Sequence, residues 1–145
     1  MRKYIFLSLA VILTMALAAT ACAKPARIQA GLDQEFTLYL GQTATITGES
    51  LEIRFAEVIS DSRCPQGVQC IWAGEASCLT YVTRTNTSSA PYKLVLVQSG
   101  ASDSSEQSFD GHVLKFRLDP YPVAGKTTPR GEKRLVMTVT RGAGE

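Results

Sequence analysis

The chain of 145 residues contains 15 lysines and arginines, 13 aspartates and glutamates and one histidine, for a formal net charge of +2. Arg2 and Lys3 belong to a leader that we expect to be removed, so the mature chain would carry equal numbers of both signs. A neutral chain without a basic stripe and interleaved aromatic residues is not typical of nucleic-acid-binding proteins. The length predicts a single domain.

The first 21 residues have the composition of a secretory signal peptide. Arg2 and Lys3 form a positive start, and an uncharged run rich in Leu, Ile and Ala extends from Tyr4 to Ala19 before a group of small residues. This order of segments predicts a signal peptide over residues 1–21. A retained membrane anchor is the alternative, since residues 4–23 carry no charge and about 20 apolar residues can span a bilayer.

The end of this segment predicts lipidation. Ala19-Thr-Ala-Cys22 resembles a bacterial lipobox, in which the cysteine becomes the first mature residue and is acylated. Two or three acyl chains on Cys22 would anchor the protein stably in a membrane. By resemblance to enteric lipoproteins, Ala23 indicates the outer membrane, with the domain facing the periplasm. Cleavage after Ala21 or Ala23 without acylation would instead give a secreted protein.

The mature chain is dominated by alternating apolar and polar residues, the pattern of β-strands with one buried face. Residues 22–33 are predicted to be a polar tether, 34–141 the domain and 142–145 a flexible tail. Seven strands are predicted, at residues 35–40, 43–47, 51–58, 76–84, 92–98, 112–118 and 133–141. Seven short strands in about 110 residues predict an all-β, immunoglobulin-like two-sheet β-sandwich, with a small β-barrel as the alternative.

Three details of this pattern are specific enough to test. The apolar alternation slips at Ala56-Glu57, which predicts a β-bulge. The strand at residues 92–98 is apolar on both faces and is expected to be a central strand. The segment 99–108 is rich in Ser, Gly and Asp and is expected to be a mobile loop.

The stretch from Asp61 to Glu75 interrupts the strands and holds two of the four cysteines and the only tryptophan. Cys64 and Cys70 flank a proline and a glycine that turn the chain, so these two are predicted to form a disulfide in an oxidising compartment. Closing this loop would stabilise the fold by about 2.4 kcal/mol on the chain-entropy model. Pairing with Cys78 is the alternative; otherwise Cys78 is expected to be a buried, small apolar residue.

Arg63, Trp72 and Glu75 of this stretch are the candidate binding residues. The preferred interpretation of Trp72 is that its ring covers the open end of the core. The alternative is an exposed anchor for a partner, because Trp is enriched at interaction hot spots. Arg63 could pair with Asp61 or with Glu75, and such pairs are more often structural than functional.

The motif Asp-Ser-Arg-Cys-Pro at residues 61–65, with Val-Gln-Cys-Ile-Trp-Ala-Gly-Glu-Ala at 68–76, resembles the signature of a group of small, functionally uncharacterised bacterial secreted lipoproteins. The resemblance implies export and a β-rich domain. It carries no catalytic residues to transfer, and Cys78 lies outside the signature.

A non-catalytic binding module is the favoured class: a lipid-anchored lipoprotein that recognises an envelope protein through a loop on a rigid scaffold. A protease inhibitor that presents the Cys64–Cys70 loop is the alternative, because pre-organisation lowers the ordering cost of binding. An enzyme is less favoured, since His112 is accompanied by no catalytic motif and could only pair with Cys78. A zinc site at these cysteines and the histidine is disfavoured by an oxidising location, so no metal or cofactor is expected.

Overall fold

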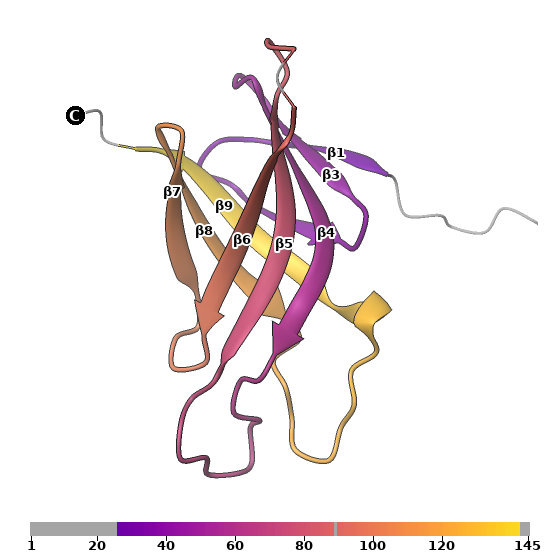
Figure 1. The fold of residues 1–145 in the computed structure, drawn as a ribbon, viewed down its shortest axis with the longest axis vertical. Helices are drawn as coiled ribbons and strands as arrows, with labels where there is room; N and C mark the ends of the chain where they lie inside the picture. The colour runs from indigo at the N-terminus through magenta and orange to yellow at the C-terminus, as the bar shows by residue number, and fades with distance from the viewer. Residues whose placement is uncertain (1–25, 89, 143–145) are drawn as a thin grey trace, which may run out of the picture.

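The computed structural model of the protein describes residues 26–88 and 90–142, which fold into two β-sheets packed face to face (Figure 1). The predicted signal peptide, Cys22 and the last three residues of the tail lie outside the described residues. One sheet has five strands in the order β1-β3-β4-β5-β6, and the other has four in the order β2-β9-β8-β7. The strands are β1 (Arg27–Ala30), β2 (Glu35–Tyr39), β3 (Thr43–Ile46), β4 (Leu51–Asp61), β5 (Glu75–Arg84), β6 (Tyr92–Ser99), β7 (Ser105–Phe109), β8 (His112–Asp119) and β9 (Arg134–Arg141).

The predicted immunoglobulin-like two-sheet β-sandwich is therefore confirmed, and the sheets do not close into a barrel. All strand pairs are antiparallel except β1 with β3. Among the described residues, the single helical segment is a short 3-10 helix, η2 (Arg130–Glu132). Within residues 26–88 and 90–142, no helix has the length and hydropathy needed to cross a membrane.

The strand count differs from the predicted seven, because two short strands were not expected. Residues 27–30 belong to the predicted tether, but they form β1 and pair with β3. Residues 105–108 belong to the predicted mobile loop, but with Phe109 they form β7 and pair with β8. Both strands are only four or five residues long and bring no more than two apolar side chains each to the core, Ile28 and Ala30 from β1 and Phe109 from β7. So short an apolar pattern does not predict a strand, and pairing with the neighbouring strand fixes the conformation.

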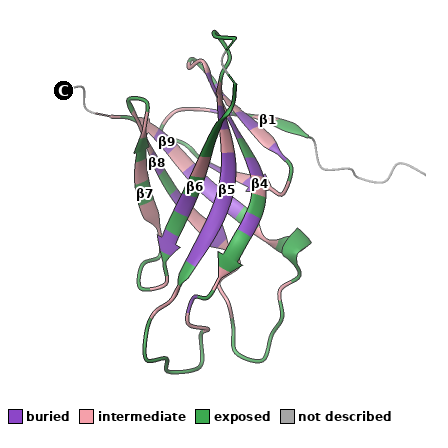
Figure 2. Ribbon diagram, in the orientation of Figure 1, coloured by how far each residue is buried: buried purple, intermediate pink, exposed green. Residues whose placement is uncertain are grey.

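The core lies between the sheets and is built from the alternate, inward-facing positions of each strand (Figure 2). The largest completely buried side chains are Leu38, Ile46, Leu51, Ile53, Phe55, Val82, Leu96, Leu114, Leu118, Leu135 and Met137, with Gln98. The predicted bulge is confirmed, since the register of β4 with β5 shifts between Phe55 and Glu57 and again between Val58 and Ser60. The extra residues let Val58 return to the buried side of β4.

The position of β6 was predicted wrongly. It is an edge strand of the five-stranded sheet, paired with β5 on one side. Val95 and Val97, which suggested a buried second face, have exposed fractions of 39% and 43% on the outer surface. The apolar residues of β6 therefore belong partly to the surface.

Candidate functional site

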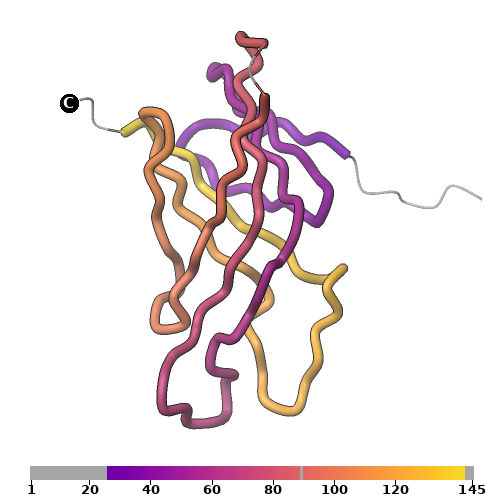
Figure 3. The backbone as a smooth tube through the Cα atoms, viewed as in Figure 1, coloured from indigo at the N-terminus to yellow at the C-terminus, as the bar shows by residue number. Residues whose placement is uncertain are grey.

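Three loops meet at one end of the sandwich, the lower end in Figure 3. They are residues 62–74 between β4 and β5, 100–104 between β6 and β7, and 120–133 between β8 and β9. We call these three loops together the loop end. All candidate binding residues from the sequence lie in or directly beside it.

The predicted disulfide is confirmed: Cys64 and Cys70 are bonded, with their Cα atoms 5.9 Å apart. Cys78 is a free, buried cysteine in the centre of β5, as expected. Burial raises the pKa of its thiol to about 12. A thiol of such a pKa is almost entirely protonated at neutral pH and is a poor nucleophile.

Arg63, one of the three candidate binding residues, is buried at the base of the disulfide loop. Its guanidinium donates to both carboxylate oxygens of Asp61, from Nε at 2.8 Å and Nη2 at 2.9 Å. Lys133 also pairs with this carboxylate. Burial acts to raise the pKa of Asp61, but the hydrogen bonds from Arg63 and Lys133 outweigh it and hold the pKa below its ordinary value.

Arg63 also reaches the loop that follows β8. Its Nη1 donates to the carbonyl oxygen of Leu118 at 2.7 Å, and Nη2 lies 3.4 Å from the carbonyl oxygen of Pro120. The guanidinium sits over the ring of Tyr121, 4.7 Å from its centroid. These partners lie 55 to 58 residues away in sequence, so Arg63 joins the disulfide loop to the start of loop 120–133.

Gln98 extends the same buried network to the third loop. Its side-chain oxygen accepts from the backbone N–H of Leu118 at 2.8 Å, and Nη1 of Arg63 lies 3.4 Å away. Its side-chain nitrogen donates to the carbonyl oxygens of Ser102 and Asp103 at 3.2 and 3.0 Å. A buried network in which every group has a partner favours one arrangement of the three loops.

Backbone contacts fix the loops further. Gln66 donates to the carbonyl oxygen of Pro122 at 2.9 Å and accepts from the N–H of Ala124 at 3.0 Å, which forms a short parallel bridge. Gly74 has φ +70, and a Cβ atom there would lie 1.9 Å from the carbonyl oxygen of Ser62. Only glycine fits such a position.

Trp72 lies on this rigid base with its ring in solvent, so the preferred interpretation as a cover of the core was wrong. Its exposed fraction is 76%, and that of Ile71 beside it is 94%. Val68 in the disulfide loop is 52% exposed, and Val123 of the adjoining loop is also exposed. We call Val68, Ile71, Trp72 and Val123 the apolar tip. Large apolar side chains on a tied loop are the type of residue that binds partners.

Glu75 is exposed at the start of β5, and its side chain does not meet Arg63. The backbone carbonyl of Glu75 accepts from the N–H of Ser62 at 2.8 Å, while all polar contacts of the Arg63 side chain go elsewhere. Of the three candidates, Trp72 and Glu75 are therefore available to a partner and Arg63 positions the loops. Sequence reasoning missed Ile71 and Val68, whose place next to Trp72 could have indicated them.

A cleft of about 500 Å³ opens between the three loops. The residues that line it include Arg63, Tyr121 and part of the disulfide loop, together with Asp103 and Asp119. The cleft therefore adjoins the apolar tip and adds polar groups to the same end of the molecule.

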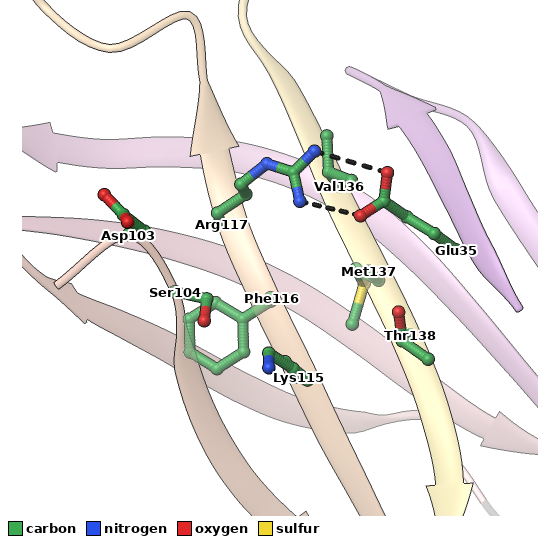
Figure 4. A pocket seen from close by; sticks show the side chains of 9 residues that line it. All are labelled: Glu35, Asp103, Ser104, Lys115, Phe116, Arg117, Val136, Met137 and Thr138. Carbon is green, nitrogen blue, oxygen red and sulfur yellow. Dashed lines mark hydrogen bonds and ion pairs between the residues drawn. The ribbon is translucent and has the colours of Figure 1, made fainter. Parts of the chain in front are cut away.

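A second cleft, of about 510 Å³, lies on the outer surface of the four-stranded sheet (Figure 4). Arg117 of β8 and Glu35 of β2 point toward each other across β9, with nitrogen–oxygen distances of 2.7 and 3.3 Å. The hydrogen bond from Arg117 lowers the pKa of Glu35. Val136 of β9, a buried residue, lines the same cleft.

The structure does not bring Cys78 and His112 together. His112 lies at the other end of the sandwich, in a pocket with Arg84, and its Nε2 is 3.3 Å from a carboxylate oxygen of Glu49. Arg84 is six residues beyond Cys78 along β5, roughly 20 Å at the rise of a strand. Among the described residues, no three His, Cys, Asp or Glu side chains are grouped so that they could hold a metal ion.

Comparison with known proteins gives no further guide. The chain matches no protein-family model, no curated protein and no solved structure.

Proposed function

We propose that this protein is an exported lipoprotein, anchored in the envelope membrane through Cys22, whose loop end binds an envelope protein without catalysis. The observation that carries the proposal is the exposure of Trp72 and Ile71 on a loop tied by a disulfide and a buried ionic network. Neither of these two side chains is part of the core, so neither contributes to its packing. Their burial against a partner would gain the hydrophobic stabilisation that the free protein forgoes.

The rigidity of the loop end supports recognition. Arg63 and Gln98 hold the three loops together from below, and the bridge at Gln66 holds two of them at the side. A partner would therefore meet an apolar tip that is already ordered. Less conformational entropy is lost on binding when the contact residues are ordered beforehand.

The proposed anchor is compatible with an accessible loop end. Only four residues separate Cys22 from Arg27, the first residue of β1. The strand β1 pairs with β3, which pairs in turn with the first residues of β4, in the half of the sandwich away from the loop end (Figure 1). An anchor before β1 would thus leave the apolar tip free.

Two variants of the full chain test the proposal, each used to capture partners from a solubilised envelope fraction. Trp72→Ala is expected to abolish capture of a specific partner protein and to leave the thermal unfolding midpoint within a few degrees. Ile59→Ala removes another exposed apolar side chain, 48% exposed in β4, and should capture the partner as the unchanged protein does. Equal capture by all three proteins, or unfolding of Trp72→Ala, would contradict the proposal.

Inhibition of a protease is the second candidate function. It is favoured by the exposure of residues 66–69 inside a closed disulfide loop whose backbone is fixed at Gln66. A panel of serine and cysteine proteases assayed with micromolar protein tests it. Inhibition that is lost when Val68 is replaced by Asp would support this function, and a panel without any inhibited protease would dismiss it.

A further inference from the structure

The outer edge of β6 is the longest sheet edge of the described residues. β6 has eight residues, whereas the other edge strands β1, β2 and β7 have four or five. It contains no proline, glycine or bulge, and Lys93 is its one charged residue. Natural proteins usually protect such edges with charges, prolines or short strands, because an open edge pairs readily with another strand.

The backbone groups on this edge belong to alternate residues. Gly100 donates to the carbonyl oxygen of Gly74, and the antiparallel ladder then repeats every second residue, at Gln98, Leu96 and Leu94. The N–H and C=O groups of the intervening residues, Lys93, Val95 and Val97, therefore point away from β5. Within the described residues they have no backbone partner beyond the sheet.

The side chains of these same three residues lie on the outer surface. Lys93, Val95 and Val97 are exposed, whereas Leu96 and Gln98 between them are buried in the core. A strand added at this edge would thus place its outer side chains beside Lys93, Val95 and Val97. Its other side chains would lie beside Leu96 and Gln98, on the side of the sheet that faces the core.

We propose that β6 pairs antiparallel with β6 of a second copy of this chain, which joins the two five-stranded sheets into one. In an antiparallel pair the residues whose backbone groups point outward must lie opposite each other. This condition places Val95 of each copy opposite Val97 of the other. The two-fold axis then passes at Leu96. Lys93 then lies opposite Ser99 of the other copy, and pairing there would replace the long contact of the Ser99 N–H with Ser105 Oγ, 3.4 Å away in the same chain. Two valines in direct contact across strands are a favourable pair.

Charge complementarity selects a second copy as the occupant. In each copy Ser99 is the neighbour of Glu75 on the outer face of the sheet, and Glu75 is exposed. In the dimer, Lys93 would cross the small Ser99 side chain to reach Glu75 of the other copy, two strands or about 10 Å away. A lysine and a glutamate side chain together span this distance, and the two-fold axis provides the pair twice.

Within one copy the two residues cannot meet. Lys93 is six residues from Ser99 along β6, which is roughly 20 Å at the rise of a strand. Any energetic coupling between Lys93 and Glu75 must therefore arise between copies. This separation makes a charge reversal a direct test.

The test measures dimer dissociation of the full chain, expressed with its leader and recovered in detergent, by sedimentation. Lys93→Glu and Glu75→Lys should each raise the dissociation constant roughly tenfold, since like charges would face each other twice. The double variant should return it to within about twofold of the original value. A monomer at all concentrations, or a double variant as weak as the single variants combined, would overturn the proposal.

A cross-link in the membrane gives a second measurement that does not depend on affinity. Lys93→Cys with Ser99→Cys in one chain should form a covalent dimer on oxidation, because these positions face each other across the two copies and lie within disulfide reach. Neither single variant should do so. Equal cross-linking by the single variants would contradict the register. The loop ends lie at opposite ends of such a dimer, so these results do not depend on the proposed partner of the apolar tip.

Discussion

The guanidinium of Arg63 and the carboxylate of Asp61 form a two-point ion pair whose side chains are 0% and 6% exposed. Such a pair costs desolvation energy, but removing one member leaves the other charge buried without its partner. Asp61→Ala should therefore lower the free energy of unfolding by about 3–5 kcal/mol. The pair of Arg27 and Glu52 is the surface counterpart, with Arg27 largely exposed.

Urea unfolding of both variants measures the difference. Arg27→Ala should lower the free energy of unfolding by no more than about 1 kcal/mol, the usual value of an exposed pair. A loss of the same small size for Asp61→Ala would show that Arg63 does not depend on this carboxylate.

The same carboxylate should make the stability depend on acid. The pKa of Asp61 is lower in the folded protein than its ordinary value of about 3.9. The stabilisation is therefore complete above that value and is lost as the pH falls through the folded pKa. The free energy of unfolding of the unchanged protein should fall below about pH 4 more steeply than that of Asp61→Asn.

Urea titrations between pH 6 and pH 2.5 test this difference. Glu35 and Glu49 also have lowered pKa values, through hydrogen bonds from Arg117 and Arg141, but they are the same in both proteins. The two stability curves should converge in acid. A constant gap over the whole range would contradict the assigned role of Asp61.

Gly74 should be one of the two least replaceable glycines of the loop end, with Gly100, where a Cβ atom would lie 2.0 Å from the carbonyl oxygen of Ala73. At Gly74 a Cβ atom would overlap the carbonyl oxygen of Ser62, in addition to the strain of a positive φ. Gly74→Ala should therefore destabilise the fold by at least about 3 kcal/mol. Gly41→Ala is the matched control, since Gly41 has φ +83 with nothing within 4 Å of its Cβ position, and only about 1–2 kcal/mol of backbone strain is expected. Equal thermal shifts for both variants would refute the close approach.

Cys78 should be chemically inert in the folded protein. Burial raises the pKa of the thiol to about 12, and the side chain is 2% exposed. Alkylation by iodoacetamide at pH 8 should be at least roughly a hundredfold slower than for a free cysteine and should become fast in denaturant. Mass spectrometry follows the reaction, and rapid labelling of the folded chain would mean that β5 opens easily or that the thiol is accessible.

The sequence predicts the strands that have an apolar face, because the alternate apolar residues of the sequence are the ones buried in the structure. Leu51, Ile53 and Phe55 of β4 are an example. It does not predict β1 and β7, which are only four and five residues long, bring few apolar side chains to the core and are fixed by pairing with β3 and β8. It misplaces β6, because the pattern Leu-Val-Leu-Val is the same for a central strand and for an edge strand with an exposed apolar row.

The disulfide could be predicted locally, since Cys64 and Cys70 are close in sequence. The burial of Arg63 could not, because it depends on Gln98 and on the Leu118 carbonyl, 35 and 55 residues away. Trp72 lies on the loop whose base Arg63 holds, and it is 76% exposed, although its place between two strands was compatible with a cover of the core.

The proposed binding of an envelope protein by the apolar tip is tested most directly by cross-linking in the intact cell. A photo-reactive amino acid at Ile71, which is 94% exposed beside Trp72, should give one discrete adduct with an envelope protein. The same amino acid at Ile59 should not give that adduct, and adding Trp72→Ala to the Ile71 variant should remove it. The same adducts from both positions, or none from position 71, would contradict a binding role for the loop end.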